Sequence, residues 1–159
     1  MSRFAEVIVL AGNAEAIMEP LTQPDPGRPW HGQFSDIGYG MFGGWAVEFA
    51  RRSHWVGLLE HLESRPWPSP HTVQVLVHDE EDDCFGLWMM HDGRLVEVPL
   101  PRTSRYYPTN LYTGGVDPDC PGILTRTDRS DGSREGEWES RTEGSSPTMS
   151  LTSGRLPSP

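Results

Sequence analysis

The chain has 159 residues and a formal net charge of −10, because 23 acidic residues stand against 13 arginines. This balance argues against direct binding to nucleic acid or to an anionic membrane and favours a basic partner. The chain contains no Lys, which excludes a Walker A phosphate loop, a pyridoxal Schiff base and a Lys nucleophile.

The first predicted element is a strand over residues 4–11, whose apolar and β-branched residues indicate burial on at least one side. We expect it to pair with residues 72–78. Residues 14–21 favour one or two helical turns, which end because prolines follow at positions 24, 26 and 29. Residues 22–40 are typical of a loop.

The best helix candidate is residues 45–63, which contain no Pro and carry Glu48 and Arg52 as an i, i+4 pair. Its apolar residues form a broad stripe that would cover a sheet, although several of them fall on other faces and Gly57 weakens the helix. The glycine-rich run before it, residues 38–44, fits no phosphate-binding motif and is interpreted as a flexible lead-in.

Residues 72–100 predict a three-stranded antiparallel meander. Asp92 and Gly93 stand between two apolar runs, a strong signal for a type I′ hairpin in which both turn residues have positive φ. This turn sets His91 opposite Arg94. Pro99 then falls where its missing N–H points away from the preceding strand, so the third strand is expected at a sheet edge.

The other turn of the meander is assigned to the acidic residues 79–83. This loop would place Val75 opposite Leu87, and Leu87 opposite Val98, with all three side chains in the core. The opposite, outer face then carries a mixed set of side chains: Gln74, His78, Cys84, Trp88 and Glu97.

Together these elements predict an α+β fold, in which a small antiparallel sheet (meander 72–100 and N-terminal strand 4–11) is covered by one main helix (45–63). After residue 100 the signals weaken to an extended arm around Tyr106 and a short strand within 122–127. Residues 128–159 have too few large apolar residues to offset their ordering entropy. We expect a single domain over 1–127, with its core in 4–100, and a disordered tail over 128–159.

Two cysteines, Cys84 and Cys120, are too few for a disulfide framework. No signal-peptide core is found, and no run approaches the roughly 18 apolar residues of a membrane span. These features predict a cytoplasmic protein, and nothing in the sequence calls for a cofactor.

The predicted hairpin loop is the most charged stretch of the chain. Its five carboxylates are consecutive: Asp79, Glu80, Glu81, Asp82 and Asp83. A solvated loop is the simplest interpretation, and the alternatives are a partner-binding acidic surface and a Ca²⁺ site, for which the loop lacks the usual glycine and bidentate Glu. Because exposed aromatic residues often dominate binding energy, Trp88 on the outer face completes the predicted partner-binding surface.

Four further residues are weak candidates for a metal site or catalysis: His78, Cys84, His71 and His91. The predicted register sets His78 opposite Cys84, where an imidazole and a thiol could act as base and nucleophile or bind a metal. The neighbouring carboxylates, however, favour the thiol over the thiolate. His71 and His91 would meet at the other end of the same strands, as half of a Zn²⁺ or Ni²⁺ site at most. Ordinary surface side chains are the simpler interpretation of both pairs.

The preferred hypothesis is a non-catalytic acidic binding module, for instance an inhibitor or immunity-type protein that masks a basic protein partner. It depends on the negative charge, the acidic loop and an exposed Trp88. The alternative is a small metal-binding protein or enzyme that uses His78, Cys84 and the acidic loop 79–83. A third reading, an accessory protein whose tail recruits partners, depends only on the composition of the tail.

Overall fold

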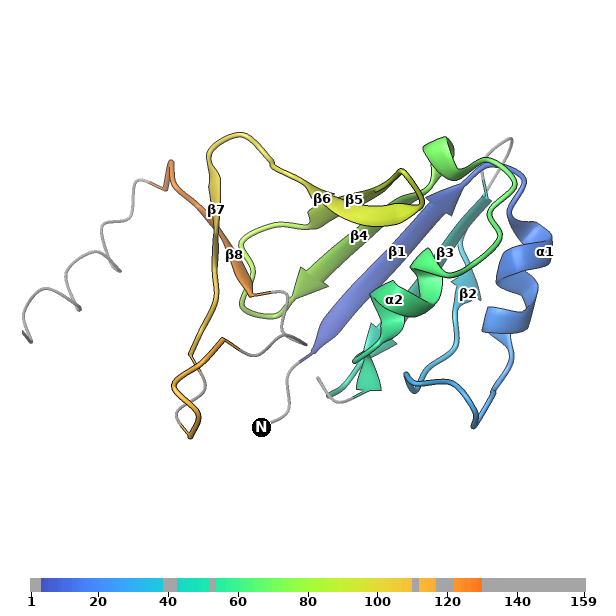
Figure 1. Ribbon diagram of the computed structural model, residues 1–159, viewed down its shortest axis with the longest axis horizontal. Helices are drawn as coiled ribbons and strands as arrows, with labels where there is room; N and C mark the ends of the chain where they lie inside the picture. Colours follow the sequence, from blue (N-terminus) through green and yellow to red (C-terminus); the bar gives the residue numbers. More distant parts are fainter. Residues whose placement is uncertain (1–3, 39–42, 52–53, 110–111, 117–121, 130–159) are drawn as a thin grey trace, which may run out of the picture. The chain divides into compact units, whose positions relative to one another are not determined.

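The computed structural model describes residues 4–38, 43–51, 54–109, 112–116 and 122–129. In these ranges the protein is mostly sheet: a six-stranded antiparallel sheet, a two-stranded sheet and short helices (Figure 1). By its contacts the chain divides after Asp128. The predicted disordered tail lies outside the described residues from position 130 onward, so it stays a prediction.

The larger sheet has the strand order β2-β3-β1-β4-β5-β6. Its strands are β1 (Ala5–Ala11), β2 (Ser35–Asp36), β3 (Gly43–Phe49), β4 (Gln74–Asp79), β5 (Gly86–His91) and β6 (Arg94–Val98). The smaller sheet pairs β7 (Thr103–Tyr106) with β8 (Ile123–Arg126). The helical segments are α1 (Glu15–Met18), η1 (Glu19–Thr22), α2 (Leu58–Glu63) and η3 (Pro70–Thr72).

The predicted α+β fold with one main helix is wrong, because the first part of residues 45–63 is a strand. Trp45, Val47 and Phe49 are buried and alternate with the less buried Ala46 and Glu48, which is the period of a half-buried strand. Helix α2 begins only after Gly57, whose φ of 79° is a left-handed conformation that a residue with a side chain rarely adopts. The described helices are therefore short, and the sheet provides most of the structure.

Strand β1 lies at the centre of the sheet, between β3 and β4. Its predicted pairing with residues 72–78 is confirmed, since Val7 lies opposite Val77 and Val9 opposite Val75. On its other edge Val7 lies opposite Val47 of β3. Both edges of β1 are thus paired with neighbouring strands, and the core is built around β1.

The hydrophobic core lies on one side of this sheet, which we call the inner face. Val7, Val9 and Val75 are completely buried there. The inner face is covered by Leu58 and Leu62 of α2 and by Trp30 and Phe34 of the loop before β2, and Figure 1 shows α2 in front of the sheet. The opposite side of the sheet is the outer face.

The loop between η1 and β2 is fixed by one buried arginine. The guanidinium of Arg28 donates hydrogen bonds to the carbonyl oxygens of Leu21 and Gln23. Its central carbon also lies 4.3 Å from the centre of the Trp30 ring, a favourable cation–π distance. Arg28 thereby holds this Pro-rich loop in place while Trp30 fills the core.

The β5–β6 hairpin has the predicted geometry. Asp92 and Gly93 have φ values of 50° and 79°, as a type I′ turn requires, and His91 lies opposite Arg94. Leu87 lies opposite Val98, and β6 is an edge strand, so both of these predictions are confirmed.

The predicted register between β4 and β5 is wrong by one residue. Val75 lies opposite Trp88 rather than Leu87, and Leu76 lies opposite Leu87. Because side chains alternate between the faces, this shift moves Trp88 to the inner face and Leu87 to the outer one. Its cause is the turn, since β4 continues through Asp79 and the connection to β5 is longer than the predicted loop 79–83.

Candidate functional site

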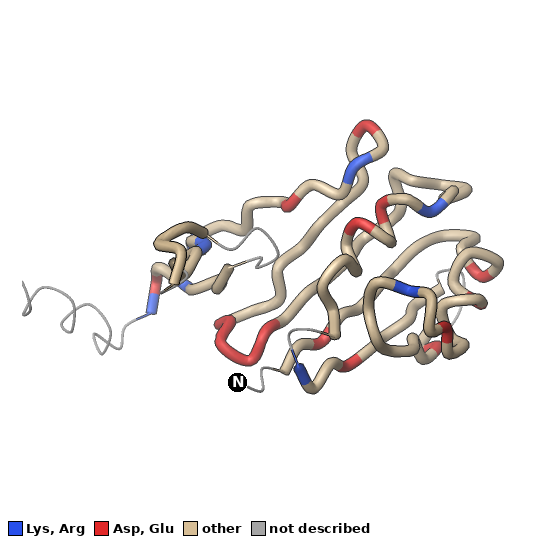
Figure 2. Tube along the Cα trace, turned by 60° about the horizontal axis from the view of Figure 1, so that its bottom comes forward, with Lys and Arg blue, Asp and Glu red and all other residues tan. Residues whose placement is uncertain are grey.

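The acidic loop is a packed structural element rather than five solvated carboxylates. Asp79 ends strand β4 with only 1% of its surface exposed. Asp82 and Asp83 are partly buried, and only Glu80 and Glu81 are exposed. Figure 2 shows this red loop beside the first strand.

Two of these carboxylates attach the loop to β8. Asp82 accepts hydrogen bonds from the backbone N–H of Asp79 at 2.9 Å and of Leu124 at 2.5 Å. Asp83 accepts one from the N–H of Arg126 at 2.8 Å, and its own N–H donates to the carbonyl oxygen of Leu124. Burial raises the pKa of the Asp82 carboxyl, an effect that the two N–H donors only partly offset.

Trp88 does not lie on an exposed surface as predicted. Only 7% of it is exposed, and its indole faces the core side of the sheet opposite Val75. The guanidinium of Arg105 lies 5.2 Å from the ring centre and also bonds the Glu97 carboxylate, with N–O distances of 2.6 and 2.7 Å. The Arg105 side chain of strand β7 therefore lies over the Trp88 ring, and little of Trp88 is left at the surface.

His78 and Cys84 are not the opposed pair that the sequence predicts. The ladder between β4 and β5 ends at Val77 and Gly86, and the His78 ring stacks on Phe85 with 4.9 Å between ring centres. His78 also lies near Glu6, with 3.8 Å between Nδ1 and a carboxylate oxygen. Burial raises the pKa of the Cys84 thiol, so this sulfur is a poor nucleophile at neutral pH.

His71 and His91 are not joined by the sheet. His71 lies in η3, before the ladder of β4 begins at Gln74. His91 lies beside the hairpin turn, where its Nδ1 is 3.2 Å from the Asp92 carboxylate. Among the described residues, no three His, Cys, Asp or Glu side chains converge in a way that could hold a metal ion.

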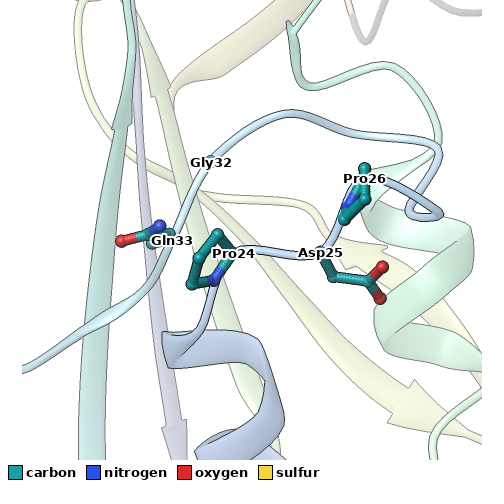
Figure 3. Close-up of a pocket in the computed structure, with 5 residues that line it drawn as sticks. All are labelled: Pro24, Asp25, Pro26, Gly32 and Gln33. Carbon is teal, nitrogen blue, oxygen red and sulfur yellow. The ribbon is translucent and has the colours of Figure 1, made fainter.

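Two shallow hollows lie elsewhere on the surface. The first, about 490 Å³, is lined by Pro24, Asp25, Pro26, Gly32 and Gln33. Figure 3 shows the Asp25 carboxylate and the Gln33 amide pointing in opposite directions, so no polar groups converge there. The second, about 670 Å³, lies between α1–η1 and β2–β3 and has carboxylates at its rim. Neither hollow has the enclosed shape with convergent polar groups of a small-molecule site.

The outer face of the sheet is a feature that the sequence analysis missed. One row across the strands contains Ala46, Ile8, Leu76, Leu87 and Val98. The next contains Gly44, Leu10, Gln74, Met89 and Val96. Ile37, whose N–H donates to the carbonyl oxygen of Gly44, extends this second row.

This outer face is largely apolar but open. Most of its side chains are partly exposed, and Ile37 and Val96 at the two edges of the second row are 49% and 50% exposed. An antiparallel sheet with one solvated face normally carries polar residues on that face. The composition of the outer face therefore differs from what folding alone requires.

Carboxylates gather at one end of the outer face. Glu6 of β1 lies directly opposite Glu48 of β3, and both are exposed. The acidic loop adjoins them, since the N–H of Glu80 donates to the carbonyl oxygen of Phe4 at 3.0 Å. Like charges that face each other across two strands destabilise a sheet.

No family model, no curated protein and no solved structure matches this chain. No helix in the described parts of the chain is long and apolar enough to cross a lipid bilayer.

Proposed function

We propose that this chain is a non-catalytic acidic binding module that acts in the cytoplasm and masks a basic protein partner, as an inhibitor or immunity-type protein does. The net charge of −10 supports a cationic partner, because a field of this sign attracts positive surfaces and repels phosphates. The exposed carboxylates, rather than the buried Trp88, are the residues that would meet it.

The observation that carries the proposal is the pair formed by Glu6 and Glu48. Two exposed carboxylates directly opposite each other lower stability by a few tenths of a kcal/mol, up to about 1 kcal/mol. Glu80 and Glu81 increase the negative potential at the same end of the sheet. A cationic partner would relieve this repulsion. The free energy that the repulsion costs the unbound protein would then contribute to the affinity for the partner.

The alternative of a metal-binding protein or enzyme has less support. It needs His78, Cys84 and the acidic loop to act together. In the structure His78 stacks on Phe85, while the carboxylates of Asp82 and Asp83 bond backbone N–H groups. Among the described residues, these contacts engage His78, Asp82 and Asp83 with groups other than the Cys84 thiol.

The proposal is tested by affinity capture from an extract of the natural host, with elution by rising salt. One variant carries Glu6→Gln and Glu48→Gln, and its matched control carries Glu15→Gln and Glu19→Gln, two exposed carboxylates on α1–η1. Both variants have the same net charge. We expect the wild type and the control to capture the same basic protein, and the Glu6/Glu48 variant to release it at lower salt.

The same variant has a second readout. Removing two opposed charges should raise the urea midpoint of the free protein, because the repulsion is lost. Capture of a protein that is not basic, or equal retention by the two variants, would contradict the proposal.

A further inference from the structure

We infer that the basic partner docks on the outer face of the six-stranded sheet, with an apolar patch that is bordered by Arg or Lys side chains. This inference rests on the proposed function and names its binding surface. The carboxylate end of the sheet would meet the basic border. The apolar rows that contain Ile37, Leu87 and Val96 would meet the patch.

The side chains of the two outer rows lie outside the hydrophobic core. The core cluster consists of inner-face residues and the side chains that cover them, and it includes no residue of the two outer rows. The second row nevertheless runs apolar from Ile37 on one side of the sheet to Val96 on the other, interrupted only by Gln74. Contiguous exposed apolar surface of this kind marks an interaction site.

The edge of the sheet at β6 is closed to another strand. The outward N–H of Leu95 donates to the Glu63 carboxylate of α2 at 2.8 Å. Pro99, just beyond β6, has no N–H to offer. Carboxylates and prolines at an edge prevent strand addition. A partner is therefore received on the face of the sheet rather than along this edge.

The charges at the outer face complement a cationic partner. Glu6 and Glu48 stand at one end of the outer face, beside the acidic loop. Within the described strands of the six-stranded sheet, the one arginine is Arg94 at the hairpin end, and its guanidinium lies 3.8 Å from the Glu63 carboxylate. A second copy of the chain would bring two molecules of charge −10 together, which electrostatic repulsion opposes. The face consequently fits a cationic partner better than itself.

The test compares three substitutions at equally exposed apolar positions. Ile37→Arg and Val96→Arg place a positive charge at the two edges of the outer face, where the side chains are 49% and 50% exposed. Val116→Arg is the matched control, because Val116 is 54% exposed and lies outside the outer face. Circular dichroism and urea midpoints first establish that all three variants are folded.

The probe is a phage-displayed library of random peptides, selected on the full-length wild-type protein. The most enriched peptide is then synthesised and titrated against each variant by calorimetry. We expect enrichment of Arg or Lys next to apolar residues. We expect affinity to fall about tenfold or more for Ile37→Arg and for Val96→Arg, and to stay within about twofold for Val116→Arg.

The outcomes separate the inference from the proposed function. Salt-sensitive binding of a basic peptide that all three variants retain would overturn the docking face and leave the proposed function standing. A peptide that is neither basic nor salt-sensitive would overturn the proposed function itself. Sedimentation velocity completes the test: a wild-type dimer lost in Ile37→Arg and Val96→Arg but kept in Val116→Arg would show that a second copy occupies the face, which overturns the inference.

Discussion

The pairing of Val75 with Trp88 makes a direct prediction about stability. Trp88→Ala should destabilise the protein far more than Leu87→Ala, although the two residues are neighbours in the sequence. Trp88 is 7% exposed and lies among core residues, whereas Leu87 is partly exposed on the outer face. If β4 and β5 had the register predicted from the sequence, Leu87 would be buried and Leu87→Ala would be the more destabilising substitution.

The magnitudes follow from burial. A buried Trp replaced by Ala loses about 3–5 kcal/mol, because the transfer term and the cavity add. The upper part of that range is expected here, since Arg105 also loses the ring on which it stacks and its cation–π energy. Leu87→Ala removes a side chain that solvent already reaches on an open face, so about 1 kcal/mol is expected.

Equilibrium unfolding in urea, followed by far-UV circular dichroism, measures both changes. Because domains of this kind have about 5–15 kcal/mol of stability, Trp88→Leu serves as a milder variant in case Trp88→Ala leaves little folded protein. A Leu87→Ala variant that is destabilised as much as Trp88→Ala would refute the observed register.

Three further predictions concern single positions. Gly93→Ala should cost about 1–2 kcal/mol in the same urea assay, because the φ of 79° is strained for any residue with a Cβ. Burial raises the pKa of Asp82 above its usual 3.8, so the folded state binds this proton more tightly and the free energy of unfolding falls as the pH rises from 3.8 through the folded-state pKa. Asp82→Asn should remove that slope, which urea titrations across this pH range would measure. Cys84 should react with iodoacetamide more slowly than free cysteine at neutral pH, because its thiol pKa is raised.

Where a signal was local, the sequence determined the structure. Asp92 and Gly93 adopt the positive φ values of a type I′ turn, and a two-residue turn leaves one register for β5 and β6. The β-branched run of β1 likewise forms a strand that pairs with β4. The turn and the extended form of β1 are specified by neighbouring residues, whereas the pairing of β1 with β4 joins segments far apart in the sequence.

The prediction of a helix over residues 45–63 was wrong because the sequence there carries signals for both a strand and a helix. Trp45, Val47 and Phe49 alternate as in a strand, while the absence of Pro and the pair of Glu48 with position 52 favour a helix. The free edge of β1 decided the outcome, since β3 supplies its backbone partners from Ala5 to Ala11. That edge exists only once the sheet has formed.

The candidate site also depends on contacts between residues far apart in the sequence. The acidic loop was predicted as a solvated turn, but Asp82 accepts the N–H of Leu124 and Asp83 that of Arg126. The hydrogen bonds to these distant backbone N–H groups lengthen the connection between β4 and β5. The register of β5 against β4 is thereby shifted by one residue from the predicted one. A shift of one residue exchanges the two faces of a strand, so Trp88 became buried and Leu87 joined the apolar outer face. The sequence by itself determined the charge, the β5–β6 hairpin and the central strand β1. Only the tertiary structure decided which side chains face outward, because that depends on partners some forty residues away.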